Sequence, residues 1–255
     1  MSLRLYAMTC GWLSMPLAML IEGGTSAHVR IPVPCYLVVH PRGTLLFDSG
    51  LSTICQRESR DYMGEFADLM QVEFTPGEEI SKRLECLELD GDGIDFLVNS
   101  HLHFDHAGGN EQIPDARLVL QKPEWEAAHE PDLIASVGYK PVDYDLGHDL
   151  LLIEGEHDVF GDGSVTCIPT YGHTPGHQSL RVALADGDVI LTGDACYLRE
   201  TLEELRLPPA AATSREAMLE SLKRIRALQS RGARIFYGHD PEFWKQVPQA
   251  PLEIT

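Results

Sequence analysis

The chain contains 255 residues, of which 44% are hydrophobic and 23% are charged. This length suits one domain, here residues 1–255, with enough interior to bury an active site. The formal net charge of −19 argues against nucleic acid as a partner, because contacts to phosphates need clustered Lys and Arg side chains.

The N-terminal region predicts neither a signal peptide nor a membrane span. It lacks a basic segment before a long apolar stretch. Pro16 and the nearby Glu22 interrupt the moderately apolar segment 12–21, which is too short to cross a bilayer. We therefore expect a cytoplasmic protein with no membrane partner. Six cysteines form no CxxC pair, which indicates reduced thiols, several of them buried: Cys10, Cys35, Cys55, Cys86, Cys167 and Cys196.

Strand-like segments dominate the first third of the chain. Residues 3–8, 35–40 and 44–47 predict strands, and a turn at residues 41–43 joins the second to the third. A helix is predicted over residues 77–87. The apolar run 94–98 predicts one more strand, which ends just before the most informative segment of the chain.

Four potential metal ligands follow that strand within six residues: His101, His103, Asp105 and His106. Imidazole nitrogens and carboxylate oxygens are the ligands that zinc and similar divalent ions prefer. His101 and His103 would share one face of an extended backbone, whereas Asp105 and His106 lie beyond a bend. An open catalytic zinc usually keeps three protein ligands and a water. Four ligands therefore predict two neighbouring metals rather than a His-rich surface loop.

Three later segments also place a potential ligand just after an apolar run or a glycine. These ligands are His173, Asp194 and His239. Nearby glycines let the backbone bend at these places. Taken alone, each residue could be an ordinary loop or capping residue. Together with the first cluster, they bring a metal-binding side chain to four separate strand ends.

Two helices are predicted in the second half of the chain. Residues 123–129 have a proline in the first turn. Thr213 and Glu216 have the spacing of a capping box, apolar residues recur at helical intervals over 218–228, and Gly232 can end the helix. This second helix is interpreted as scaffold.

The motifs together resemble the metallo-β-lactamase superfamily, and within it the N-acyl-homoserine lactone lactonases of the quorum-quenching branch. The matching segments are FDSG (47–50), HLHFDHAGGN (101–110), GHTPGHQSL (172–180), GDACY (193–197) and YGHD (237–240). The resemblance implies an α/β fold, an αββα sandwich of two mixed β-sheets flanked by helices. Periodicity alone predicts mixed α and β, with a hairpin from residues 181–184 to 189–191.

The resemblance also implies how the ligands are shared. His101, His103 and His173 would bind one divalent ion, and Asp105, His106 and His239 the other, with Asp194 bridging both. Zinc is expected, although iron, manganese or cobalt also accept mixed His and carboxylate ligands. Two metals roughly 3.5–4 Å apart can share a hydroxide, which would attack and open a small-molecule lactone. The chain has no Gly-x-Ser-x-Gly motif, which fits a mechanism without a serine nucleophile.

Tyr197 points towards lactones, because it resembles the active-site tyrosine of the lactonases. Its phenol could donate a hydrogen bond to the substrate carbonyl oxygen; the alternative is a core tyrosine with a satisfied hydroxyl. Asp105 could pass a proton to the departing alkoxide. Asp48 is expected to orient a ligand histidine rather than to bind metal, and His177 is expected to be structural.

The substrate pocket is harder to place from sequence. Phe104 lies inside the metal loop and is a candidate for its lining, and segment 199–212 is a candidate for a loop at its border. An apolar stripe could hold an acyl chain, although such stripes more often belong to the core: Met63, Phe66, Met70 and Phe74.

Three other functions are alternatives to the lactonase. A glyoxalase-II-like thioesterase shares the motifs, but a glutathione thioester would favour basic residues near the C-terminus, where only Lys245 follows His239. A flavodiiron-type redox protein would have glutamate in place of His103. A non-catalytic scaffold conflicts with the complete ligand set. The protein is expected to act as a monomer or homodimer.

Overall fold

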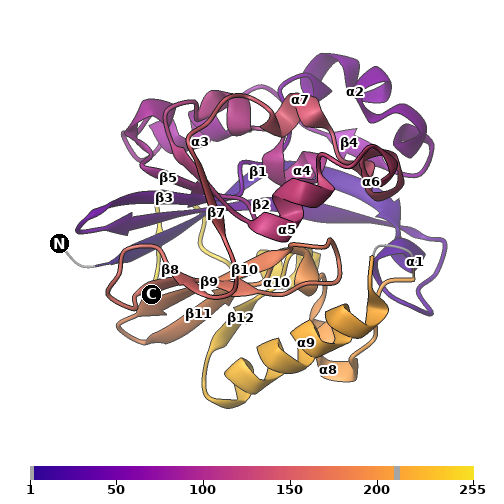
Figure 1. Cartoon of the computed structure of the whole chain (residues 1–255). Coiled ribbons are helices and arrows are strands. Elements are labelled where there is room, and N and C mark those ends of the chain that lie inside the picture. The colour runs from indigo at the N-terminus through magenta and orange to yellow at the C-terminus, as the bar shows by residue number, and fades with distance from the viewer. Residues whose placement is uncertain (1–2, 210–212) are drawn as a thin grey trace.

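A mixed sheet contributed mainly by the N-terminal half of the chain forms one layer of the molecule (Figure 1). The computed structural model describes residues 3–209 and 213–255. Within these ranges the strand order is β13-β1-β2-β3-β5-β6-β7, with β4 paired to β1. The strands are β1 (Arg4–Pro16), β2 (His28–His40), β3 (Gly43–Phe47), β4 (Gln71–Glu73), β5 (Phe96–Val98), β6 (Arg117–Gln121), β7 (Leu150–Ile153) and β13 (Glu253–Ile254).

A second sheet from the C-terminal half has the order β12-β11-β10-β9-β8 over the same described residues. Its strands are β8 (His157–Asp158), β9 (Val165–Pro169), β10 (Gln178–Leu184), β11 (Gly187–Leu191) and β12 (Arg234–Phe236). The predicted hairpins β2–β3 and β10–β11 are both present, with Val39 opposite Thr44 and Val182 opposite Val189.

The two sheets pack face to face, and helices cover their outer faces (Figure 1). Val38, Val98, Val182 and Leu191 belong to the apolar core between the sheets. The larger sheet packs against α3 (Ile80–Glu85), α5 (Lys122–Ala127) and α7 (Pro141–Tyr144). The smaller sheet packs against α8 (Arg199–Glu204) and α9 (Arg215–Ser230). This confirms the predicted αββα sandwich.

Short helices complete the connections between these layers. The α-helices are α1 (Leu17–Leu20), α2 (Cys55–Met63), α4 (Phe104–Ala107), α6 (Pro131–Leu133) and α10 (Pro241–Trp244). The 3₁₀ turns are η1 (Gly64–Asp68), η2 (Gly91–Gly93), η3 (Asn110–Gln112) and η5 (Gly193–Ala195), and η4 (Ile134–Gly138) is a π-helical turn.

Three local predictions differ from the structure. Helix α3 (Ile80–Glu85) is shorter than the helix predicted over 77–87. The N-cap of α9 is Ser214, whose Oγ accepts from the backbone N–H of Ala217 at 3.2 Å. Thr213, the predicted cap, instead donates its hydroxyl to the carbonyl oxygen of Gly172 at 3.2 Å. The segment predicted as a loop over 199–212 contains helix α8, and its residues 210–212 lie outside the described residues.

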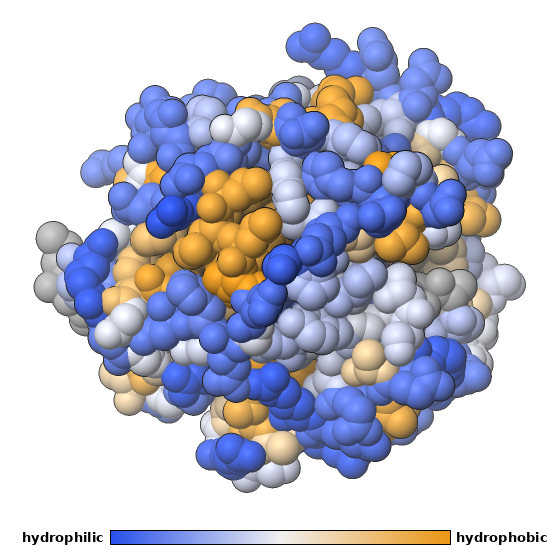
Figure 2. All heavy atoms as spheres, viewed as in Figure 1, coloured by the Kyte–Doolittle hydropathy of each residue, from blue (hydrophilic) through white to orange (hydrophobic). Residues whose placement is uncertain are grey.

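The molecular face in Figure 2 is mostly hydrophilic, as the large negative charge leads one to expect. An apolar patch interrupts it over edge strand β7, where Leu152 is 38% exposed. None of the helices in the described ranges has the length and hydrophobicity needed to cross a bilayer. The six cysteines are free thiols, and Cys86 alone among them is exposed.

Candidate metal centre

Three histidine nitrogens converge where the loops after β5 and β9 meet. Nε2 of His101 lies 2.9 Å from Nδ1 of His103 and 3.1 Å from Nε2 of His173. Nδ1 of His103 and Nε2 of His173 are 3.0 Å apart. Nitrogens bound at about 2.0–2.1 Å to one tetrahedral zinc would lie roughly 3.3–3.4 Å apart. The triangle is therefore close to the size of one face of a tetrahedral site.

A second group lies beside the first and combines α4 with the loop after β12. Asp105, His106 and His239 each offer one potential ligand atom, and these atoms lie within 4.8 Å of one another. Oδ2 of Asp105 is 3.6 Å from Nε2 of both histidines. The structure thus brings together residues from two distant parts of the sequence.

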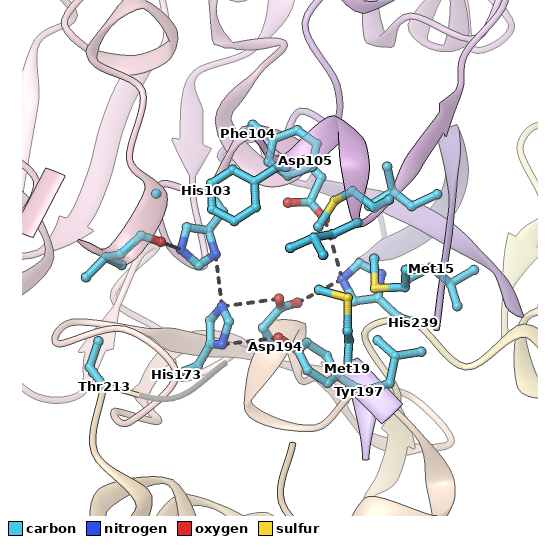
Figure 3. A pocket seen from close by; sticks show the side chains of 18 of the residues that line it. Met15, Met19, His103, Phe104, Asp105, His173, Asp194, Tyr197, Thr213 and His239 are labelled. Atoms are coloured by element: carbon cyan, nitrogen blue, oxygen red, sulfur yellow. Dashed lines mark hydrogen bonds and ion pairs between the residues drawn. The ribbon is translucent and has the colours of Figure 1, made fainter. Parts of the chain in front are cut away.

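Asp194, in the turn after β11, lies between the two groups (Figure 3). Its Oδ1 is 3.1 Å from Nε2 of His106 and 3.1 Å from Nε2 of His239. Its Oδ2 is 3.3 Å from Nε2 of His173 and 3.8 Å from Nε2 of His101. One carboxylate therefore faces both sets of nitrogens, which is the arrangement a bridging ligand needs.

The residues fit a pair of divalent cations on chemical grounds as well. Nε2 of His106 and Oδ1 of Asp194 are buried, and neither has a hydrogen-bond partner although they are only 3.1 Å apart. Buried polar atoms without partners are rare, because leaving them unsatisfied is costly. A cation in contact with both atoms would remove that cost, so the centre is suited to divalent metal ions.

The ionisation of His101, His173 and Asp194 fits the same interpretation, whereas the neighbouring carboxylates outweigh burial and raise the pKa of His106 and His239. Burial lowers the pKa of His101 and His173 well below the usual value, so both imidazoles are neutral and have lone pairs to share. Burial opposes the charge on Asp194, but His106, His239 and His173 outweigh it and hold its pKa well below the usual value. The carboxylate is therefore ionised and available to a cation.

Hydrogen bonds on the far side of the rings fix which nitrogen faces the centre. Asp48 accepts from Nδ1 of His106 at 2.8 Å, and the carbonyl of Pro32 accepts from Nδ1 of His239 at 2.8 Å. His103 donates from Nε2 to the carbonyl of Val137 at 3.0 Å. Such partners set the tautomer and ring orientation of metal-binding histidines.

Asp48 has the orienting position that the sequence predicted, and it does more than contact His106. Its Oδ1 accepts from the backbone N–H of Ser100 at 2.6 Å, and its Oδ2 accepts from the Ser100 hydroxyl at 2.8 Å. The residue has a φ of 59°, a left-handed conformation that asparagine and aspartate tolerate better than most residues. This strained backbone aims the carboxylate at the loop that begins the metal motif.

Glu124, in the first turn of α5, was missed by the sequence interpretation. Its buried carboxylate accepts from the backbone N–H of Leu102 at 3.0 Å, the hydroxyl of Thr174 at 2.7 Å and the backbone N–H of Gly176 at 2.9 Å. One side chain therefore ties the loop of His101 and His103 to the loop of His173. A Cβ on Gly176 would lie 2.1 Å from the Glu124 backbone nitrogen, so glycine allows this close approach.

His177 lies outside both ligand groups, in agreement with the structural role expected for it. Its Nε2 accepts from the backbone N–H of Asp194 at 3.0 Å, so the proton is on Nδ1. Nδ1 then donates to the hydroxyl of Thr170 at 2.9 Å. Burial lowers the pKa of His177 to about 3, so the ring is neutral and can keep this accepting role. It positions the backbone that presents Asp194.

Tyr197 is buried beside the two groups, and its hydroxyl lies 3.3 Å from Nδ1 of His173. Burial, together with Asp194 and Asp105, raises its pKa well above the usual value. The phenol therefore stays protonated at neutral pH and can act as a donor. Figure 3 shows its side chain next to Asp194 at the cavity.

A cavity of about 580 Å³ opens from this polar end. His103, Asp105, His173, Asp194, Tyr197 and His239 line the polar end. Most of the rest is apolar: Leu13, Met15, Met19, Leu20, Ile31, Phe66, Leu69, Met70, Phe104, Leu133 and Val137. Phe104 is thus a lining residue, as predicted. Two residues of the predicted apolar stripe, Phe66 and Met70, line the cavity. The other two, Met63 and Phe74, are core residues that do not line it.

The chain is similar to known proteins over most of its length. Residues 29–239 match the family model of the metallo-beta-lactamase superfamily. The chain is 32% identical over 260 residues to N-acyl homoserine lactonase AttM of Azorhizobium caulinodans, covering 98% of this chain and 97% of that protein. It is also 32% identical to an N-acyl homoserine lactonase of Bacillus thuringiensis, covering 89% and 88% of the two chains.

Solved structures agree with these sequence matches. One is an N-acyl homoserine lactone hydrolase with the product N-hexanoyl-L-homoserine bound at its catalytic metal centre. It superposes with a TM-score of 0.89 and 29% identity over all of both chains. A variant of the Bacillus thuringiensis lactonase AiiA, with N-decanoyl-L-homoserine at its active site, superposes with a TM-score of 0.89 and 28% identity, also over both full chains.

Proposed function

Because the chain belongs to the metallo-beta-lactamase superfamily, we propose that it is a metal-dependent hydrolase that opens the lactone ring of N-acyl-homoserine lactones. The observation that carries the proposal is the position of Asp194 between two sets of ligand atoms, at the polar end of an apolar cavity. The polar end suits the lactone ring and the apolar part suits an acyl chain. Relatives similar over nearly the whole chain are N-acyl homoserine lactonases.

In this proposal His101, His103 and His173 would hold one ion, and Asp105, His106 and His239 would hold the other, with Asp194 available to both. Zinc is the first choice, because nitrogen-rich sites with carboxylates suit it. Divalent ions held there would act as Lewis acids on the lactone carbonyl and lower the pKa of water to near neutrality. Asp48 and Glu124 keep the ligand loops in place.

Two further side chains act on the substrate. Tyr197 stays protonated and donates a hydrogen bond to the carbonyl oxygen, where negative charge grows during attack. Asp105 lies at the same polar end, where its carboxylate takes the proton released by the attacking water and passes it to the ring oxygen as the carbon–oxygen bond breaks. Burial of these groups in a largely apolar cavity strengthens each interaction, because little water competes with it.

The apolar cavity also favours a lactone over a glutathione thioester. Its described lining residues include no lysine or arginine, whereas glutathione has carboxylates that basic side chains would bind. An acyl chain needs only apolar contacts. The lining therefore favours an N-acyl-homoserine lactone as substrate.

Metal analysis and a hydrolysis assay together test the proposal. Elemental analysis of gently purified protein should approach two divalent ions per chain. A pH-drop assay against lactones, thioesters and β-lactams should show proton release from N-acyl-homoserine lactones above all. Full activity in protein that carries no metal would overturn the metal-dependent mechanism, and activity confined to thioesters would move the assignment to that class.

A further inference from the structure

Two segments that are distant in the sequence form neighbouring walls of the cavity. The first, residues 55–70, contributes Phe66, Leu69 and Met70, and the second, residues 131–144, contributes Leu133, Val137 and Gly138. The two walls are in contact, because a Cβ built on Gly138 would lie 3.2 Å from Cζ of Phe66. The phenyl ring therefore packs directly on the glycine backbone.

A polar contact joins the same two segments behind this apolar one. The hydroxyl of Tyr62 donates to Oδ2 of Asp143, and Nζ of Lys140 donates to the carbonyl oxygen of Tyr62 at 2.6 Å. The Lys140 ammonium also lies 4.7 Å from the centre of the Tyr62 ring. Figure 1 shows the corresponding helices α2 and α7 next to each other.

Each wall is anchored in the core by its own buried residues, such as Met63 in the first segment and Tyr144 in the second, but it is built from short elements. The helical elements of the walls are short, the longest being the nine residues of α2, and such helices depend on tertiary contacts. Phe66 is 39% exposed and Leu69 is 51% exposed, so part of the first wall faces solvent. Asp143 is only 3% exposed, and a buried carboxylate without partners would be strongly unfavourable.

We propose that Tyr62, Lys140 and Asp143 form a clamp that fixes the distance between the two cavity walls and thereby determines affinity for long acyl chains. The clamp does not touch the substrate, so these are positioning residues. Val137, in the second wall, also accepts the hydrogen bond from His103, and this contact holds the wall at its polar end independently of the clamp. Opening the clamp should therefore weaken contacts to the far carbons of the chain and leave the lactone end unchanged.

This inference rests on the proposed function for the identity of the ligand, so its test uses ligands that are not hydrolysed. Calorimetry would compare N-decanoyl-L-homoserine with N-butanoyl-L-homoserine on the metal-loaded protein. Tyr62→Phe removes one hydrogen bond of the clamp. The dissociation constant of the decanoyl ligand should rise roughly tenfold, and that of the butanoyl ligand should change less than twofold.

A matched control is available within the first wall. Arg60 and Asp68 form an exposed ion pair at 2.7 Å that does not reach the second segment. Arg60→Gln should leave both dissociation constants unchanged. Amide hydrogen exchange over residues 55–70 and 131–144 should accelerate in Tyr62→Phe and not in Arg60→Gln. Should Tyr62→Phe fail to fold, Lys140→Met removes the amino group and keeps the apolar stem.

The clamp is rejected if both ligands weaken equally, if neither changes, or if the parent protein binds neither. These results do not depend on catalysis. A protein that hydrolyses no lactone but shows the chain-length effect would refute the proposed function and keep the clamp. An active lactonase without that effect would do the reverse.

Discussion

Asp48 holds the imidazole of His106 through a 2.8 Å hydrogen bond to Nδ1, and this leaves Nε2 of His106 facing Asp194 at 3.1 Å. The carboxylate reaches the ring from a backbone with a φ of 59°. A non-glycine residue in this sparsely populated conformation persists only where the surrounding structure holds it there, which indicates that the contact between Asp48 and His106 has a function. The orientation of the ring, and not only its presence, is thus built into the fold.

Asp48→Asn should weaken metal binding without abolishing it. The amide can accept from only one side, so either Ser100 or His106 loses a hydrogen bond. Loss of such an outer partner typically costs 10–100-fold in metal affinity, so we expect a decrease of about that size. Competition with a chelator of known affinity measures it. The more exposed Asp162, which pairs with Arg42, provides the control Asp162→Asn, and equal affinities in the two variants would contradict the prediction.

Glu124→Gln tests the residue that joins the two ligand loops. The amide cannot accept from Leu102 and Gly176 at the same time without turning an N–H towards a backbone N–H. We expect roughly 10–100-fold weaker metal binding, with the release rate of one ion raised. Tyr144→Phe is the control, because it removes a buried hydrogen bond to Ala128 in the same region without contact to either loop. Equal effects of the two variants on metal affinity would show that Glu124 contributes only to stability.

The clustering of the candidate metal ligands could be predicted from the sequence, because each follows an apolar run or a glycine and four of them lie within six residues. Asp48 was also placed correctly, through its short motif. Glu124 was missed because its partners, Leu102, Thr174 and Gly176, are 22, 50 and 52 residues away. No local signal distinguishes it from an ordinary acidic residue in the first turn of a helix.

The other features that the sequence did not predict also depend on contacts between residues that are distant in the sequence. Thr213 and Ser214 are both good caps by local rules, and the contact from Thr213 to Gly172 decides between them. Tyr62 and Asp143 are 81 residues apart, and their pairing follows from where α2 and α7 lie on the larger sheet. Local patterns predict elements and ligand clusters, but they carry no information on which distant polar groups will meet.

Asp143 should make the protein less stable as the pH rises towards neutrality. Burial raises its pKa to about 7, against the opposing effects of Tyr62 and Lys140, and Glu111 raises it further. The unfolded value is about 3.9. The folded state therefore favours the protonated form, so its stabilisation is complete below about pH 4 and is lost as the pH rises through about 7.

Urea unfolding of the parent and of Asp143→Asn from pH 4.5 to 8 measures this effect. The free energy of unfolding of the parent should fall relative to that of the variant over this range, and most steeply between about pH 5 and 7. Subtracting one free energy of unfolding from the other removes the contribution of the other titrating groups, which the two proteins share. A constant difference between the two proteins would mean that Asp143 does not titrate in this range.

Tyr197→Phe tests the residue that narrows the superfamily to lactonases. The change keeps the buried ring and removes only the hydroxyl. Loss of one donor to a developing oxyanion can cost roughly 2.7–4 kcal/mol when it acts alone. Because metal ions would share that task, we expect about 1–2 kcal/mol, or roughly tenfold, mainly in kcat. The raised pKa of Tyr197 means that the phenol does not ionise near neutrality, so the pH profiles of parent and variant should be parallel.

Metal content should stay the same, and Tyr6→Phe, which loses a hydrogen bond from Arg4 far from the centre, should keep full activity. If Tyr197→Phe hydrolyses lactones as fast as the parent, the hydroxyl has no part in the reaction and Tyr197 is a packing residue.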